Sequence, residues 1–301
     1  SPATVVVDEP ITIEILGSEP WEPQNFDKEF AGSIVLKKAL LKSINVVSAK
    51  LMQQVGPEKV IRTARKFGIK SPLGKNLSLA LGTSGVAPLE IASAYSVIAN
   101  LGIYNEPYLI QQIEDFQGNR LYEHFYQGVQ QYSPDTLYPL LDMMQGVVDR
   151  GTGRIIRRMG FKHPAAGKTG TTNDFKDAWF NGFTKDISAS VWVGFDDNAS
   201  MKTKSGKGLT GASAAAPIWV HFMQKALAGK TRVKFPVPEN IKFNTIDVET
   251  GRLPDEFSLE KIQVAVKEDV DLSPLPIVDT ELESETELLQ ESESIEDPSK
   301  S

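Results

Sequence analysis

The chain of 301 residues contains no cysteine, which excludes disulfides and thiolate metal sites and leaves the redox compartment open. Its three histidines, His124, His163 and His221, lack the spacing of zinc ligands, and we interpret them as surface or core residues rather than as ligands or a triad base. No apolar run approaches the ~20 residues of a membrane-spanning helix, and no signal peptide is recognisable. The sequence therefore predicts neither a metal nor a cofactor.

The net charge of −7 is unevenly distributed along the chain. Residues 268–301 contain 12 acidic side chains and one basic side chain, Lys300, whereas residues 1–267 contain 31 basic and 27 acidic ones. A tail rich in Glu, Ser and Pro carries too little apolar surface to fold, so we predict that 268–301 is disordered. The remaining body is mildly basic, which suits an anionic ligand. The excess is too small to indicate nucleic-acid binding, and no such motif is present.

Hydrophobic periodicity predicts helices in the first half of the chain and antiparallel strands in the second. After a strand and loop over 4–15, the predicted helices are 33–55, interrupted by the polar residues 42–45, then 57–69, 87–102 and 135–151. The predicted strands form hairpins over 108–123 and 178–195, and a closing helix follows over 211–229. Since no regular βαβ alternation is present, the pattern indicates an α+β fold with an antiparallel sheet flanked by helices.

The stretch "AAGKTGTTNDFKDAWFNGF", residues 165–183, is the first candidate for chemistry. On a strand, Lys168 and Gly170 face one way, while Thr169 and Thr171 face the other. Gly170 leaves room for a ligand backbone at the strand edge, and an ammonium with nearby hydroxyls suits a carboxylate. Free strand N–H groups suit a peptide or an oxyanion. The alternative is a Gly/Thr turn that carries a solvated lysine.

The second candidate is Ser43-Ile44-Asn45, which interrupts a helical pattern. A serine and an asparagine two positions apart at a helix end can point a hydroxyl and an amide into one cleft. The alternative is a pair of polar residues on the wet face of a helix. Neither candidate is specific by itself, so their order and surroundings decide their interpretation.

Taken together and in this order, the segments resemble the transpeptidase domain of class A penicillin-binding proteins, the bifunctional peptidoglycan synthases. The resemblance rests on "WEPQNFDKEFAGSIVLKKALLKSINVVSAKL", "LALGTSGVAPLEIASAYSVIANLG", "GVVDRGTGR", the Lys168 stretch, and "SVWVGFDDN" followed by "GASAAAPIW". It implies a penicillin-binding protein/serine β-lactamase-like fold with a helical subdomain, incomplete at the N-terminus. We expect the transpeptidase domain over 1–230, a C-terminal extension over 231–267 and the acidic tail over 268–301.

The resemblance implies a DD-transpeptidase that cross-links peptidoglycan stem peptides ending in D-Ala-D-Ala through a serine acyl-enzyme, and that binds β-lactam antibiotics. It implies catalytic roles for Ser43, Lys168 and Thr171. Ser43 would join the proton relay to the leaving amine, and Lys168 would tune the electrostatics and hold Ser43. The backbone N–H of Thr171 would form half of the oxyanion hole.

Substrate binding is implied for four residues. Asn45 would hold the substrate's amide, and Thr169 and Thr171 would bind its terminal carboxylate. Gly170 would let the substrate dock as an added strand. The implied location is the outer face of the cytoplasmic membrane of a bacterium, with attachment only through a segment upstream of this chain. Cell-wall synthesis proteins are expected as partners, and nucleic acid is not.

The chain departs from the family at the nucleophile. The family's Ser-x-x-Lys motif precedes the Ser43 element, and nothing before Ser43 fits it. The single match, Ser258–Lys261, follows Lys168 and is rejected because its order is wrong. We therefore expect truncation just after the nucleophile, so that the chain as given lacks acylation activity while its parent has it. The glycosyltransferase domain and membrane anchor would also lie upstream.

Two other readings remain open. A non-catalytic module could keep the cleft in order to recruit partners or recognise peptidoglycan, and the missing nucleophile favours it. A hydrolytic relative, such as a DD-carboxypeptidase or a β-lactamase, agrees less well with the surrounding segments. A Ser-x-x-Lys upstream would favour the enzyme, and a divergent stretch would favour the module.

Overall fold

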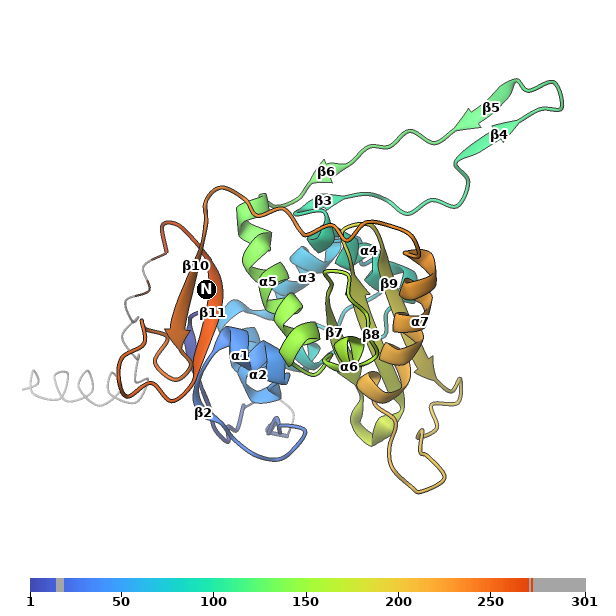
Figure 1. The fold of residues 1–301 in the computed structure, drawn as a ribbon. Coiled ribbons are helices and arrows are strands. Elements are labelled where there is room, and N and C mark those ends of the chain that lie inside the picture. The colour runs from blue at the N-terminus through green and yellow to red at the C-terminus, as the bar shows by residue number, and fades with distance from the viewer. Residues whose placement is uncertain (15–18, 271, 273–301) are drawn as a thin grey trace, which may run out of the picture.

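The structure is a computed structural model that describes residues 1–14, 19–270 and 272 (Figure 1). The predicted acidic tail lies almost entirely outside these residues. The helices are α1 (Leu36–Lys42), α2 (Asn45–Val55), α3 (Pro57–Lys66), α4 (Pro88–Ala99), α5 (Pro134–Arg150), α6 (Ile155–Arg158) and α7 (Ala216–Ala226). The strands are β1 (Val5–Asp8), β2 (Gly32–Val35), β3 (Ile103–Tyr104), β4 (Gln112–Glu114), β5 (Arg120–Glu123), β6 (Val129–Gln130), β7 (Ala166–Thr171), β8 (Asp177–Phe183), β9 (Ser188–Gly194), β10 (Ile241–Asp247) and β11 (Lys261–Lys267).

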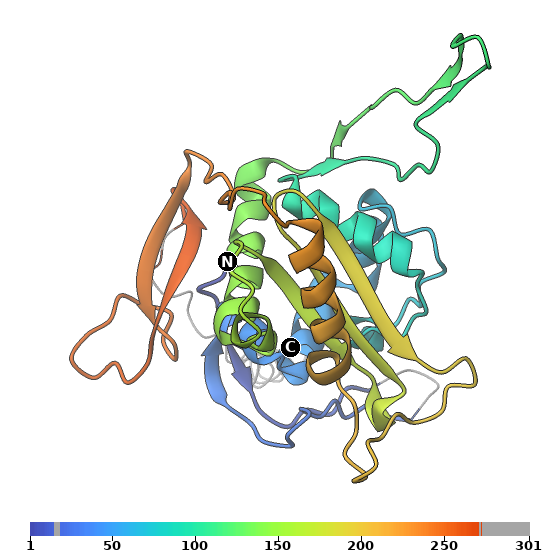
Figure 2. The ribbon, with the colours of Figure 1, turned by 45° about the vertical axis from the view of Figure 1, so that its right-hand side comes forward.

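The central element is an antiparallel sheet in the order β7-β8-β9, which leaves β7 at an edge. Successive side chains of β8 point to opposite faces, so Phe180 and Phe183 enter different cores. Phe180 packs with Trp219 of α7, which covers one face of the sheet, while Phe183 packs with residues of α4 and α5 on the other (Figure 2). The predicted hairpin around 185–186 and the closing helix are confirmed, although residues Gly211–Ala215 form a π-helical turn before α7.

The N-terminal part of the chain and the hairpin near its C-terminal end pack together beside this sheet. Strand β1 pairs with β2, and β10 pairs with β11. The Val35 N–H donates to the carbonyl of Val248, and Val35 and Val264 share one buried cluster with residues of α1 and α5. The hairpin in the predicted C-terminal extension, 231–267, therefore packs in the same core as residues near the start of the chain.

The prediction of a helix starting at Ser33 was wrong. Residues Gly32–Val35 form β2, because they pair with Val5–Asp8, and α1 begins only at Leu36. Residues 32–35 are largely apolar and lead directly into α1, so the local pattern does not distinguish strand from helix. Pairing with the distant strand β1 decides their conformation. The predicted interruption at 42–45 is confirmed, since α1 ends at Lys42 and α2 starts at Asn45.

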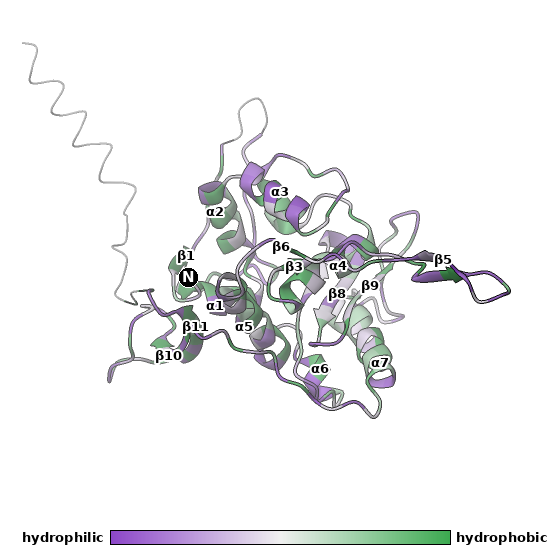
Figure 3. Ribbon diagram, turned by 90° about the horizontal axis from the view of Figure 1, so that it is seen from above, coloured by the Kyte–Doolittle hydropathy of each residue, from purple (hydrophilic) through white to green (hydrophobic). Residues whose placement is uncertain are grey.

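Residues 103–130 form an arm that reaches away from the body (Figures 1 and 3). Strands β3 and β6 pair at its base, and β4 and β5 form the predicted hairpin near its tip. The Asp115 carboxylate accepts bonds from the backbone and side chain of Asn119, which closes the turn. Of the helices in the described part of the chain, none is both long and apolar enough to cross a membrane.

Candidate functional site

Strand β7 carries Lys168 at the edge of the sheet, where one row of backbone groups has no strand partner among the residues that the structure describes. The Thr172 N–H donates to the carbonyl of Asp177 on the β8 side, at 3.1 Å. Backbone groups alternate in direction along a strand, so the N–H of Thr171 points away from β8, toward the open edge. The edge therefore presents a backbone donor within a few residues of the Lys168 ammonium.

Ser43 lies opposite this edge, in the turn between α1 and α2. Its backbone is left-handed, with φ 60° and ψ 48°, which is uncommon for a residue other than glycine. The N–H groups of Ser43 and Ile44 donate to the carbonyls of Leu40 and Ala39, at 3.1 and 3.0 Å, and so close the end of α1. This conformation directs the Ser43 hydroxyl to Lys168, whose Nζ donates to Ser43 Oγ at 2.6 Å.

The surroundings of Lys168 favour the loss of its proton. Burial lowers the pKa of Lys168 to about 8, because a charged ammonium is poorly solvated there. Its hydrogen-bond acceptors are Ser43 Oγ and the carbonyl of Thr169, at 3.1 Å, and within the described part of the chain it forms no ion pair. Lys168 and Ser43 thus form a hydrogen-bonded pair in which the lysine has a lowered pKa, an arrangement typical of functional sites.

Asn45 follows Ser43 by two residues at the start of α2. Its Nδ2 donates to the carbonyl of Gln24 at 2.8 Å, and its backbone N–H donates to Asn25 Oδ1 at 3.0 Å. Among the residues that the structure describes, Asn45 Oδ1 has no hydrogen-bond donor. That oxygen is available to accept an N–H from a bound ligand.

The threonines after Lys168 have partners of their own. Thr169 Oγ1 and Thr152 Oγ1 share a hydrogen bond of 2.7 Å, and Thr171 Oγ1 accepts from the Gly211 N–H at 3.0 Å. Each hydroxyl keeps further hydrogen-bonding capacity. Gly211 packs directly against the backbone of Gly170, which leaves no room for a side chain at position 211, while a Cβ at position 170 would lie 3.1 Å from the Trp179 Cβ.

Thr152 is a site residue that the sequence analysis missed. Its segment was recognised, but no role was given to the residue itself. The Thr152 N–H donates to the carbonyl of Leu41 at 3.1 Å, which ties the loop after α5 to the end of α1 beside Ser43. Thr152 therefore links the Ser43 turn to β7, and only this spatial placement identifies it.

The rejected Ser-x-x-Lys match lies elsewhere in the fold. Ser258 belongs to the loop between β10 and β11, where its hydroxyl donates to Asp255 Oδ1 at 3.3 Å and accepts from the Asp255 N–H at 3.1 Å. It has no contact with Lys168. The structure thus brings Ser43 and Lys168 together, with Asn45, Thr169, Gly170 and Thr171 adjacent in sequence to one or the other.

Comparison with known proteins gives a single consistent result. The family described as the penicillin binding protein transpeptidase domain matches residues 2–223. Penicillin-binding protein 1A of Pseudomonas aeruginosa is 35% identical, and the match covers 83% of this chain and 36% of that protein. The chain therefore spans about a third of the length of this curated relative.

Solved structures confirm the predicted α+β fold. Penicillin-binding protein 1A from Haemophilus influenzae matches with a TM-score of 0.79 at 28% identity, covering 88% of this chain and 44% of that one. The PonA1 protein from Mycobacterium tuberculosis, in complex with penicillin V, matches with a TM-score of 0.67 at 27% identity, covering 78% of this chain and 66% of that one.

Proposed function

The chain belongs to the penicillin-binding protein transpeptidase domain family, and on that premise we propose that it supplies part of the active site of a peptidoglycan DD-transpeptidase. The observation that carries the proposal is the bond of 2.6 Å from Lys168 Nζ to Ser43 Oγ. It joins the two short motifs that the sequence separates by 125 positions. The pair consists of a half-buried lysine and a serine in a left-handed turn.

In the proposed reaction, a serine attacks the carbonyl carbon of the penultimate D-Ala of a stem peptide that ends in D-Ala-D-Ala. The C–N bond to the terminal D-Ala breaks, and an amine of a neighbouring stem peptide later takes the acyl group. The attacking hydroxyl passes its proton to the lysine of the Ser-x-x-Lys motif as the new C–O bond forms. Ser43 gives its own hydroxyl proton to the departing amine and is reprotonated by Lys168, which regains its proton from that motif lysine. A lysine with a pKa of about 8 suits this relay, since its two protonation states interconvert near neutral pH.

The remaining site residues hold the substrate. Asn45 accepts the substrate's amide N–H, and the hydroxyls of Thr169 and Thr171 donate to its terminal carboxylate. The Thr171 N–H stabilises the oxyanion, a contribution of roughly 3–4 kcal/mol for one donor in other enzymes. Gly170 leaves the strand edge clear, so that the substrate pairs with β7 as an added strand.

No residue of this chain is assigned as the nucleophile. The proposed acylation needs the serine of a Ser-x-x-Lys motif, and the match at Ser258 lies in the wrong place. We therefore assign acylation by stem peptides and β-lactams to the full-length protein, not to these 301 residues alone. The corresponding location is the bacterial cell envelope, outside the cytoplasmic membrane, with cell-wall synthesis proteins as partners.

Covalent labelling of the full-length protein by a fluorescent penicillin tests this function. We expect labelling of the wild type, and a rate lower by about 100-fold or more in Lys168→Ala and Ser43→Ala, the usual range for loss of a proton-transfer group. Lys176→Ala is the matched control, because this second lysine of the same stretch has no hydrogen bond to Ser43. Labelling unchanged in both site variants removes the assigned roles. Absence of labelling in a folded full-length protein favours the non-catalytic module.

A further inference from the structure

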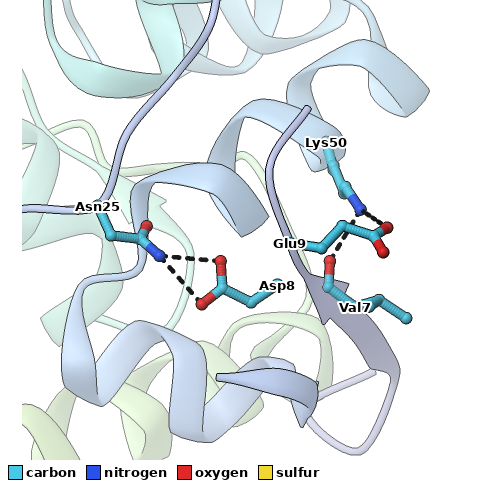
Figure 4. Close-up of polar contacts among 5 residues, drawn as sticks. All are labelled: Val7, Asp8, Glu9, Asn25 and Lys50. Carbon is cyan, nitrogen blue, oxygen red and sulfur yellow. Dashed lines mark hydrogen bonds and ion pairs between the residues drawn. The ribbon is translucent and has the colours of Figure 1, made fainter. Parts of the chain in front are cut away.

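Asn25 is a buried side chain behind the site, and the proposed chemistry gives it no role. It is 4% exposed, and it lies in the loop between β1 and β2. Its Nδ2 donates to both carboxylate oxygens of Asp8, at 2.9 and 3.0 Å (Figure 4). It also donates to the carbonyl of Glu29 at 2.9 Å. Its Oδ1 accepts from the N–H groups of Asn45 and Val46, at 3.0 and 3.2 Å.

These contacts make Asn25 the cap of α2 from a distance. The first N–H groups of a helix have no partner within the helix, and a polar side chain just before it usually supplies one. Here the residue before α2 is Ile44, which has no side-chain acceptor. Asn25, 20 positions earlier than Asn45, takes over that function. It thereby fixes the end of the turn that carries Ser43.

Asp8 sets the direction of the Asn25 amide. Asp8 is 1% exposed at the end of β1, and its carboxylate also accepts from the Ala31 N–H at 2.8 Å. Both carboxylate oxygens of Asp8 accept N–H donors, so the NH₂ end of Asn25 faces them. The amide oxygen is then left to face the N–H groups of α2. Two buried polar residues thus determine each other's orientation.

The turn is consequently held on both sides. The N–H groups of Ser43 and Ile44 donate to carbonyls of α1, and the next N–H groups, of Asn45 and Val46, donate to Asn25. A left-handed serine costs conformational free energy, of order 1–3 kcal/mol, and persists only when its surroundings determine it. Asn25 belongs to those surroundings, although it does not contact Lys168.

We propose that Asn25, oriented by Asp8, is a positioning residue that holds the Ser43 turn against Lys168. The inference rests on the proposed function in one respect, namely that the Ser43–Lys168 contact serves catalysis. Its physical content is independent of catalysis. Without the Asn25 acceptor, the start of α2 loosens, the turn moves off the lysine, and water reaches the ammonium.

The test is a titration of the Lys168 ammonium by NMR in the complete chain with isotope-labelled lysine, assigned with Lys168→Arg. We expect a midpoint of about 8 in the wild type. In Asn25→Asp, a second carboxylate faces Asp8 and the turn opens, so the midpoint rises by about one pH unit or more toward the ordinary value of ~10.4. The direction follows from the cause, since burial is what lowers this pKa. In the full-length protein, the same variant should acylate with penicillin about tenfold more slowly.

Two further variants separate positioning from general loosening. The double change Asp8→Asn with Asn25→Asp exchanges the amide and the carboxylate, so a donor again faces an acceptor and Asn45 and Val46 keep their acceptor. It should return the midpoint toward about 8. Glu9→Gln removes the ion pair of 2.7 Å to Lys50, which also joins α2 to the end of β1 (Figure 4). It should leave the Lys168 midpoint unchanged.

The proposal is overturned if Lys168 titrates in folded Asn25→Asp as in the wild type, or if Glu9→Gln shifts it equally. Should Asn25→Asp fail to fold, Asn25→Ala is judged by the same criterion. If the full-length wild type is not acylated by penicillin, the proposed function fails, while the titration still decides the positioning role. If the midpoint shifts but acylation does not slow, positioning is supported and the catalytic purpose of the contact is lost.

Discussion

The wall of the site and the protruding arm are built in opposite ways. Near the tip of the arm, β4 and β5 pair across one short turn, and large apolar side chains of the arm such as Leu109 and Phe116 are 98% and 96% exposed. At the site, the bonds that bring the separate segments together join residues far apart along the chain. Lys168 reaches Ser43 across 125 positions, and Asn25 reaches Asn45 across 20. Local contacts suffice for the hairpin at the tip of the arm, whereas the site exists only if the whole body folds.

The difference implies that the arm can change with little effect on stability, while the site depends on the cores that surround it. The Trp219 ring packs between the rings of Phe161 and Phe180, at centroid distances of 5.3 and 5.2 Å. It thereby supports the sheet to which β7 belongs. The Phe116 ring, at the tip of the arm, is almost fully in water. Replacing each of these two aromatic residues by alanine compares the stability of the two regions directly.

The largest expected effect is that of Trp219→Ala. It removes a fully buried ring and the hydrogen bonds from its Nε1 to the carbonyls of Gly182 and Ala189, both 3.2 Å. We expect a loss of about 3–5 kcal/mol in the free energy of unfolding, measured by urea denaturation. Phe116→Ala should change it by no more than about 0.5 kcal/mol. Equal losses in the two variants would contradict the comparison.

A smaller effect is expected at Gly211, where the π-helical turn approaches the sheet. A Cβ at this position would lie 2.2 Å from the carbonyl oxygen of Trp179 and 2.6 Å from that of Gly170, and neither backbone atom can move freely. Gly211→Ala should therefore cost about 1–3 kcal/mol of stability and displace β7. The slower labelling of the full-length protein by penicillin would report that displacement.

Gly85→Ala is the matched control for Gly211→Ala. Gly85 lies in the loop before α4, and a Cβ there would meet no atom within 4 Å. We expect a change in unfolding free energy within about 0.5 kcal/mol and normal labelling. If Gly211→Ala is as well tolerated as Gly85→Ala, the close packing behind the site is not required for its geometry.

The same contrast explains which features the sequence could predict. The arm hairpin and the break at Ser43 follow from local patterns, namely turn residues between strands and polar residues in a helical repeat. Strand β2 was mistaken for helix because its partner, β1, is distant. Asn25 and Thr152 were missed for the same reason, since their roles arise from Asp8, α2, Leu41 and Thr169. Lys168 and Ser43 were singled out from their residue types and local pattern, and the family resemblance then gave them roles.

The final comparison sets Lys168 of the site against Lys70, which lies fully exposed and pairs with Glu106 at the base of the arm, at 2.7 Å. Burial lowers the pKa of Lys168 to about 8, below its unfolded value, so the unfolded chain binds more protons between about pH 8 and 10.5. Stability linked to Lys168 therefore rises with pH across this window. The hydrogen bond to Glu106 raises the pKa of Lys70, so the stability linked to Lys70 is present below its unfolded pKa and is lost as pH rises through the folded one.

Lys168→Met and Lys70→Met test these opposite signs by urea denaturation at pH 7.5 and pH 10. We expect Lys168→Met to be more stable than the wild type, and this gain in the free energy of unfolding should be about 1–2 kcal/mol smaller at pH 10 than at pH 7.5. The figure is lower than the full shift of the Lys168 pKa would give, because the side chain is partly exposed. The free energy of unfolding of Lys70→Met should differ from that of the wild type by much less at either pH. The small loss of stability in this variant should diminish at pH 10. A stability difference between Lys168→Met and the wild type that is the same at pH 7.5 and pH 10 would mean that the lysine of the site is no more isolated from water than one on the surface, and the lowered pKa on which the proton relay depends would lose its physical basis.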